Sequence, residues 1–226
     1  MLHLAIYDMD KTITRRPTWT PFLVRFAASV APWRLMLLPI AGFLVLGYAI
    51  RLVGRARLKE LTQGLMMGNH IDPETIASVA RRFAADIVAR GVYDQAIARI
   101  AEDRAAGRDV ILATASCRFY VTAIAARLGI AGSNVIATES VTDGQGHVIA
   151  RIAGENCYGP AKLRMIEAWL SAQGLARDQV HARFYSDHAS DAPALAWADE
   201  AFAVCPHGPL RTMAQTHGWE ILDWAD

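Results

Sequence analysis

Four short apolar runs along the chain are followed by polar residues: residues 2–7, 109–113, 181–185 and 201–204. After residue 107, such runs alternate with helical segments. Runs of this length, bounded by polar residues, are typical of buried strands. Because helical segments separate the later runs, the pattern predicts an α/β fold: a Rossmann-like parallel sheet flanked by helices. Residues 140–152, SVTDGQGHVIARI, predict a β-hairpin with Asp143-Gly144 at or near its turn.

Residues from about 18 to 106 show no strand pattern and are expected to be helical throughout. One helix start is marked by Asp72, Pro73 and Glu74, which supply an N-cap, a proline at the first helical position and an acid in the first turn. This segment is far longer than a βα crossover requires. We therefore expect an inserted all-helical cap, residues 15–106, and a catalytic core made of residues 1–14 and 107–226.

The composition fits one large domain or a domain with an insertion. Of the 226 residues, 53% are hydrophobic and 20% charged, so a substantial core is expected. The three cysteines, Cys117, Cys157 and Cys205, are odd in number and far apart, which argues against a disulfide framework and for a reducing compartment. The candidate chemistry begins within the first ten residues, so no signal peptide is expected. These features predict a cytoplasmic protein.

The charge is unevenly distributed along the chain. Residues 11–68 hold nine basic residues and one acidic residue, a net charge of +8, and the total of +1 leaves −7 for the remainder. The same segment contains the most apolar run, residues 35–50. A basic and apolar segment favours an anionic membrane surface or an amphiphilic anionic substrate. It carries no nucleic-acid-binding motif, so no nucleic-acid partner is expected.

The apolar run itself permits two interpretations. Its sixteen residues would extend about 24 Å as a helix, which is marginal against a hydrocarbon core of roughly 30 Å. A helix buried in the cap is one interpretation. An interfacial helix with Trp19 and Trp33 near the lipid headgroups is the other.

Three polar clusters follow the predicted strands: DMDKT at 8–12, TAS at 114–116 and SDHASD at 186–191. In an open parallel sheet, ligands bind beyond the carboxyl ends of the strands. Asp8 and Asp10 repel one another unless a cation lies between them. Asp8 and Asp187 supply hard oxygen ligands of the kind that Mg²⁺ prefers. The sequence therefore predicts a magnesium site at this edge.

This set of residue types suits phosphoryl transfer. One aspartate can attack phosphorus to form an aspartyl-phosphate, and another can serve as general acid and then general base. Thr114 and Lys162 can hold the phosphoryl oxygens, where negative charge accumulates. A receiver-like phosphoacceptor domain uses similar residues, but it places the phosphorylated aspartate on a middle strand and lacks a large cap.

In this order, DMDKT, Thr114, Lys162 and the pair Asp187/Asp191 resemble the four motifs of the haloacid dehalogenase (HAD) superfamily. The similarity is greatest to subfamily IB, which contains phosphoserine phosphatase and carries a helical cap after the first strand. The resemblance implies that Asp8 is the nucleophile. It also implies that Asp10 is the acid/base and that its backbone carbonyl binds the metal.

The remaining roles follow from the same resemblance. Thr114 and Lys162 would bind phosphate, Asp187 would bind Mg²⁺, Asp191 would support the site and Thr12 would orient the first loop. Lys11 and Ser186 stand where the family often has glycine, but neither departure removes a catalytic group. For the residues around the motifs, we expect Ser116 to cap the following helix, His188 to lie at a surface or helix start, and Cys117 to be a packing residue.

An aromatic segment, the apolar run and Gly-Arg-Ala-Arg at 54–57 are together similar to bacterial HAD-type phosphatidylglycerophosphate phosphatases. The candidate substrate residues of the cap are Arg15, Arg16, Trp19, Arg51 and Arg55. We expect a Mg²⁺-dependent phosphomonoesterase that acts on a lipid or amphiphilic phosphate such as phosphatidylglycerophosphate, peripheral on the inner face of the cytoplasmic membrane. A phosphatase of a small soluble ester such as phosphoserine, and a non-catalytic membrane-associated phosphate-binding module, are the alternatives. The sequence does not indicate an oligomeric state.

Overall fold

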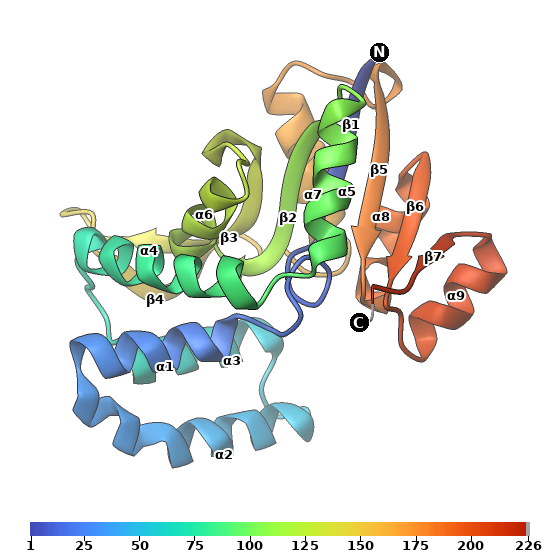
Figure 1. Cartoon of the computed structure of the whole chain (residues 1–226). Helices are drawn as coiled ribbons and strands as arrows, with labels where there is room; N and C mark the ends of the chain where they lie inside the picture. The colour runs from blue at the N-terminus through green and yellow to red at the C-terminus, as the bar shows by residue number, and fades with distance from the viewer. Residues whose placement is uncertain (225–226) are drawn as a thin grey trace.

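A computed structural model describes residues 1–224, which form a seven-stranded sheet in the order β4-β3-β2-β1-β5-β6-β7 (Figure 1). The strands are β1 (Leu2–Tyr7), β2 (Asp109–Cys117), β3 (Val135–Thr142), β4 (Val148–Ala153), β5 (Val180–Ser186), β6 (Glu200–Val204) and β7 (Glu220–Leu222). All neighbours pair in parallel except β4, which is antiparallel to β3. The predicted sheet flanked by helices is confirmed, and the predicted hairpin supplies its antiparallel edge.

From Leu4 to Tyr7 the central strand β1 is buried on both faces, as the apolar run there predicts. Ala5 and Tyr7 pack into the cluster beneath one layer of helices, while Leu4 and Ile6 pack into the cluster on the other side. The first layer contains α4 (Pro73–Arg90), α5 (Asp94–Ala105) and α6 (Arg118–Arg127), and the second contains α7 (Pro160–Ala172), α8 (Ala192–Trp197) and α9 (Pro209–His217). The two layers hold the strand ends that carry the polar clusters in fixed positions.

The segment after β1 is helical, as expected. It comprises α1 (Trp19–Val30), the 3-10 helix η1 (Pro32–Leu37), α2 (Leu38–Ala49) and α3 (Arg55–Met66), followed by α4 and α5. In Figure 1, α1, α2 and α3 lie beyond one end of the sheet, with α2 outermost. α4 packs against α6, and α5 packs against β2, so the last two helices of the expected cap lie on the core. The division at residues 15–106 stays a prediction.

The apolar run forms most of η1 and α2, and no residue of either helix is buried. Pro32–Ala49 is long and apolar enough, by length and composition, to cross a membrane. The interpretation of residues 35–50 as a helix buried in the cap is therefore wrong. Apolar composition alone does not bury a helix, because burial requires neighbouring elements to cover it.

A buried carboxylate, Asp103 of α5, connects that helix to the two central strands. Asp103 is fully buried and accepts hydrogen bonds from the Tyr7 and Tyr185 hydroxyls at 2.5 and 3.0 Å. The two tyrosine rings stack with their centroids 4.2 Å apart. The Arg183 Nη1 atom lies 2.8 Å from the other Asp103 oxygen. Because Tyr7 is the last residue of β1 and Tyr185 is the last but one of β5, this network aligns the strands that present the first and last motifs.

Candidate active site

The carboxylates of the first and last motifs meet at one edge of the sheet. β1 and β5 are neighbours, and the backbone N–H of Asp8 donates to the Tyr185 carbonyl at 2.9 Å. Burial raises the pKa of Asp8 to about 7; Lys162 opposes this shift, and the negative charges of Asp191, Asp187 and Asp10 add to it. Four aspartates from two segments, the loops after β1 and β5, therefore converge, as predicted.

Lys162 places a cation beneath this cluster. It belongs to the first turn of α7, and its side chain is 3% exposed. Its Nζ lies 2.9 Å from Asp8 Oδ1 and 2.5 Å from Asp191 Oδ2. Burial disfavours the Lys162 charge, but Asp191 and Asp8 outweigh burial and raise its pKa. Asp191 also accepts a hydrogen bond from the Ser186 hydroxyl at 2.8 Å. Because Ser186 fixes the Asp191 carboxylate, Asp191 in turn fixes the position of the Lys162 ammonium group.

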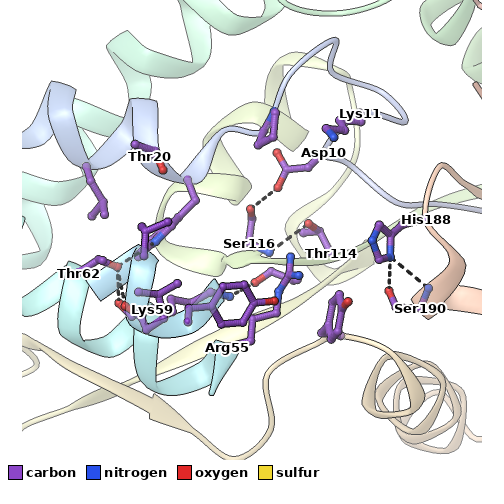
Figure 2. A pocket seen from close by; sticks show the side chains of 18 of the residues that line it. Asp10, Lys11, Thr20, Arg55, Lys59, Thr62, Thr114, Ser116, His188 and Ser190 are labelled. Atoms are coloured by element: carbon purple, nitrogen blue, oxygen red, sulfur yellow. Dashed lines mark hydrogen bonds between the residues drawn. The ribbon is translucent and has the colours of Figure 1, made fainter. Parts of the chain in front are cut away.

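The Asp10 carboxylate is turned toward the entrance of the cap. Its Oδ1 accepts hydrogen bonds from the backbone N–H and the hydroxyl of Thr18, both at 2.8 Å. Its Oδ2 accepts one from the Ser116 hydroxyl at 2.7 Å (Figure 2). Thr18 immediately precedes α1, and its hydroxyl lies 3.0 Å from that of Tyr120. Asp10 is thereby tied to β2 and to the start of the cap.

The interpretation of Ser116 as a helix cap is wrong. β2 continues through Cys117, so Thr114 and Ser116 belong to the strand rather than to the loop after it. Cys117 is the N-cap residue of α6 and makes no side-chain capping bond. Ser116 instead donates to Asp10, and its N–H donates to the Thr114 hydroxyl at 3.1 Å. It joins the expected phosphate-binding threonine to the expected acid/base.

Thr12 fixes the first loop against the last motif. The backbone N–H of Asp187 donates to the Thr12 hydroxyl at 3.0 Å, and Thr12 is fully buried. This contact positions Asp187 beside Asp8. Burial raises the pKa of Asp187, and the nearby Lys11 and Lys162 charges oppose that shift.

The donor set at this edge suits Mg²⁺. Asp8 and Asp187 offer carboxylate oxygens, and Asp10 offers a backbone carbonyl in the same loop as Asp8. Over residues 1–224, no group of three or more histidine, cysteine, aspartate or glutamate side chains is arranged as a metal site. A hard cation held by two carboxylates and a carbonyl would complete its coordination with waters and phosphate oxygens, which is how Mg²⁺ is usually bound. The donor set therefore fits the metal that the sequence predicts.

A pocket of about 640 Å³ joins this edge to the cap. At one end its walls are Asp8, Asp10, Thr114, Ser116, Lys162 and Asp187. At the other end its walls are side chains of α1, α2 and α3, most of them apolar: Trp19, Leu23, Val24, Leu38, Val45, Leu58 and Met66. The pocket thus has a charged catalytic end and an apolar cap end.

Lys59 of α3 is a pocket residue that the sequence analysis missed. It is 8% exposed, and its ammonium group donates to the Ala115 carbonyl and, at 2.7 Å, to Asn156 Oδ1. Burial lowers its pKa. A signal was present, because Lys59 shares a helical face with Thr62 and the buried Met66, at spacings of three and seven. A basic residue on the inward face of a helix is a candidate ligand-binding residue.

The five cap residues expected to meet the substrate separate into two groups. Arg55 and Trp19 line the pocket; Arg55 stacks on the Tyr158 ring at 3.9 Å, and Trp19 donates to the Thr62 hydroxyl at 3.3 Å. The other three do not line it. Arg15 lines a neighbouring cavity of about 110 Å³, whereas Arg16 and Arg51 lie outside both cavities.

Two other residues near the motifs behave as expected. Burial raises the pKa of Cys117 to about 11, which suits a packing thiol rather than a reactive one. The His188 side chain accepts a hydrogen bond from the backbone N–H of Ser190 and caps the short helix that follows. Figure 2 shows this contact at the rim of the pocket.

A family model described as haloacid dehalogenase-like hydrolase matches residues 5–196. The chain belongs to this family. The matched residues include every motif described above, from Asp8 to Asp191. The expectation of a HAD-type phosphoric monoester hydrolase is confirmed at this level, because relatives of the chain carry phosphatase names.

Phosphoserine phosphatase SerB1 of Mycobacterium tuberculosis is 28% identical over 232 residues, covering 97% of this chain and 70% of that protein. A Streptomyces azureus protein named inhibition of morphological differentiation protein is also 28% identical, over 97% of this chain and 78% of its own length. A Bordetella pertussis protein of unknown function has a TM-score of 0.88 at 26% identity, with both chains fully covered. A substrate-bound phosphoserine phosphatase has a TM-score of 0.63 at 16% identity, over 98% of this chain and 93% of that one, which shows a shared fold.

Proposed function

We propose that this protein is a Mg²⁺-dependent phosphomonoesterase that works through an aspartyl-phosphate on Asp8. The observation that carries the proposal is the position of Asp8, which is held by Lys162 at one end of a pocket that also contains Asp10 and Thr114. Asp8, Asp187 and the Asp10 carbonyl would hold the metal. When bound, Mg²⁺ would offset the charge of the carboxylates and polarise the phosphoryl group.

In the first half of the reaction, the Asp8 carboxylate attacks phosphorus and the bond between phosphorus and the ester oxygen breaks. Asp10 donates a proton to the departing alkoxide. The Lys162 ammonium and the Thr114 hydroxyl hold the non-bridging oxygens, where charge accumulates in the transition state. The alcohol leaves, and the phosphoryl group remains on Asp8.

In the second half, Asp10 accepts a proton from water as the water oxygen attacks phosphorus. The bond between phosphorus and the Asp8 oxygen breaks, which releases inorganic phosphate and restores the carboxylate. Ser116 and Thr18 hold Asp10 by three hydrogen bonds, so the same oxygen atoms are presented in both halves. This orientation supports alternating acid and base roles.

For the substrate, we propose a lipid or amphiphilic phosphate such as phosphatidylglycerophosphate, which the protein would meet at an anionic membrane surface. The apolar cap end of the pocket supports this choice, since a small polar ester would leave Leu23, Leu38 and Val45 facing water. A small soluble ester such as phosphoserine is the second candidate. It is favoured by the name of the Mycobacterium tuberculosis relative.

The mechanism is tested by replacing the nucleophile. Asp8→Asn is expected to lower kcat on a generic phosphate ester with Mg²⁺ by at least about a thousandfold. Arg164→Gln, which removes an exposed ion pair with Glu155, serves as the control and should retain activity. Acid-quenched wild-type protein should carry labelled phosphate that Asp8→Asn lacks. Full activity of Asp8→Asn would refute the mechanism.

The substrate is tested by a phosphate-release screen that includes lipid phosphates in mixed micelles. Higher kcat/KM on the lipid than on phosphoserine supports the amphiphilic substrate, and the reverse supports the soluble one. A folded wild-type protein that turns over no ester in the panel would favour the third possibility, a phosphate-binding module without catalysis.

A further inference from the structure

Helices η1 and α2 carry apolar side chains on two opposite faces. One stripe lines the pocket: Leu38, Ala41, Gly42 and Val45. The other points away from it and consists of exposed side chains: Met36, Ile40, Phe43, Leu46 and Ile50. Within each stripe the residues are mostly three or four positions apart, so each follows one side of the helix. A helix that is apolar all round is normally buried, yet no residue of η1 or α2 is buried.

The outward stripe is part of a concentrated apolar surface. Residues 1–224 expose 13 large hydrophobic side chains, and 11 of them lie between Val30 and Leu52. Phe43 is 72% exposed and Met36 is 82% exposed. Monomeric proteins rarely expose contiguous apolar patches of this kind, so the surface indicates a binding partner.

The charge around this surface identifies the kind of partner. Arg51 follows α2 by two residues, and Arg55 and Arg57 lie in the first turn of α3. All three side chains are exposed. An apolar helix face flanked by cations is complementary to a bilayer that contains anionic lipids. A second copy of this chain fits poorly, because a two-fold contact through α2 would bring the same arginines of both copies together.

The connections of α2 determine its orientation. α1 and α3, the helices before and after the apolar segment, pack against one another. Both ends of η1–α2 must therefore stay on the same side of a bilayer, which excludes a single crossing. In Figure 1, α2 runs alongside α1 and α3 as the outermost element of the cap. A helix in this position can lie in the plane of the membrane surface.

We propose that η1–α2 is an interfacial helix whose outward stripe enters an anionic bilayer, and whose inward stripe forms a wall of the slot for the substrate's alkyl chain. The docking of the outward stripe is argued from the exposed surface alone. The alkyl-chain slot on the inward stripe rests on the proposed phosphatase function. In this arrangement η1–α2 lies between the bilayer and the pocket. A lipid phosphate therefore passes around this helix to reach Asp8, and its alkyl chain moves from the membrane to the inward stripe.

The pocket side of α2 has room for such a chain. A Cβ atom added to Gly42 would meet no atom within 4 Å apart from its chain neighbours and the backbone of its own helix. Gly42 lies among Leu38, Ala41 and Val45 in the pocket wall. Glycine at this position therefore leaves open space beside the apolar end of the pocket, which a larger side chain would fill.

Docking is tested by co-sedimentation with vesicles of phosphatidylcholine containing about one third phosphatidylglycerol, against vesicles of pure phosphatidylcholine. The double variant Phe43→Gln/Leu46→Gln should lose at least about tenfold in affinity for the anionic vesicles, because two side chains leave hydrocarbon. Its turnover of p-nitrophenyl phosphate should match wild type, since neither side chain lines the pocket. Ile97→Gln removes an exposed apolar side chain of α5 outside the patch and should bind like wild type.

Unchanged vesicle affinity of the double variant would overturn the docking surface. So would a wild-type protein that forms a dimer through this face and binds no vesicles. Asp8→Asn should bind vesicles like wild type. If wild type turns over no ester but shows the expected vesicle binding, the proposed function fails and the docking surface stands.

The slot is tested with a pair of alkyl phosphates that differ in chain length. Gly42→Phe should lower the ratio of kcat/KM for dodecyl phosphate over ethyl phosphate by at least about tenfold, because the added ring occupies space for several methylene groups. Gly47→Ala, on the same helix but outside the pocket lining, is the matched control. A ratio unchanged by Gly42→Phe would overturn the slot while leaving vesicle binding untouched.

Discussion

The Ser116 hydroxyl donates a hydrogen bond to Asp10 Oδ2 at 2.7 Å, and this contact links the end of β2 to the loop after β1. Thr18 holds the other oxygen of the same carboxylate from the cap side. The expected acid/base is therefore positioned jointly by β2 and by the residue that precedes α1.

We expect Ser116→Ala to lower kcat on an alkyl phosphate by about ten- to a hundredfold, because Asp10 loses the donor that fixes its orientation. KM should change little. The loss should be smaller with p-nitrophenyl phosphate, whose leaving group needs little protonation. Ser133→Ala, at an exposed serine remote from the pocket, is the control. Equal losses on both esters would show that Ser116 does not act through Asp10.

The sequence is sufficient to predict the sheet and the convergence of the motifs. Parallel strands end at one edge, so Asp8, Thr114 and Asp187 could be expected together once their strands were recognised. Ser116 was misjudged because a serine near a helix start normally caps it, and nothing local shows that β2 continues to Cys117. The strand extends there through pairing with β3, which is a tertiary effect.

Lys59 and the apolar run show a different limit. Which face of α3 is inward depends on how the helix is placed over the core, so the spacing of Lys59 marks it as a candidate but does not show that its ammonium group reaches the pocket. The hydropathy of residues 35–50 is equally compatible with a buried and an interfacial helix. Only the arrangement of α1, α2 and α3 shows that no element covers the outward stripe.

Mg²⁺ activation is expected to depend on pH through Asp8. Burial, together with the neighbouring carboxylates and against Lys162, raises the pKa of Asp8 to about 7, so below about pH 7 the metal-free protein favours the protonated form of Asp8. This shift makes folding less favourable as pH rises from about 4 to about 7. Mg²⁺ requires the ionised carboxylate, so the proton competes with the metal. As pH rises toward about 7, the Mg²⁺ concentration for half-maximal activity should fall by up to about tenfold per pH unit. Above about pH 7 it should stay constant.

The measurement is a Mg²⁺ titration of activity at pH 6, 7 and 8, with the melting temperature followed in parallel. Mg²⁺ should raise the melting temperature more at pH 8 than at pH 6, because more of Asp8 is available to the metal. Asp8→Asn should show no such pH dependence of the melting temperature. A half-maximal Mg²⁺ concentration that is the same at all three pH values would contradict a protonated Asp8 in the metal-free site.

Lys59→Met should raise KM by about tenfold, because it removes the cation that joins α3 to the Ala115 carbonyl and Asn156 beside the pocket. Burial lowers the pKa of Lys59, so its charge is lost in the folded protein at a lower pH than for an exposed lysine. The KM of wild type should therefore rise at alkaline pH, below the range where free lysine titrates. Lys59→Met should lack this rise, and Arg57→Gln on the exposed side of α3 should retain it. An alkaline rise in Lys59→Met equal to that of wild type would exclude Lys59 as its source.

Asp103→Asn should destabilise the fold by roughly 3–5 kcal/mol, because Asp103 is fully buried and accepts from Tyr7, Tyr185 and Arg183. At roughly 2–4 °C per kcal/mol for a chain of this size, the melting temperature should fall by about 10 °C. Glu155→Gln, which breaks an exposed ion pair, should leave it unchanged. Since the two tyrosines lie near the carboxyl ends of the strands that present Asp8 and Asp187, the variant should also bind Mg²⁺ more weakly at temperatures where it is fully folded. If the variant has a lower melting temperature but a normal Mg²⁺ affinity, the Asp103 network stabilises the fold without positioning the metal ligands.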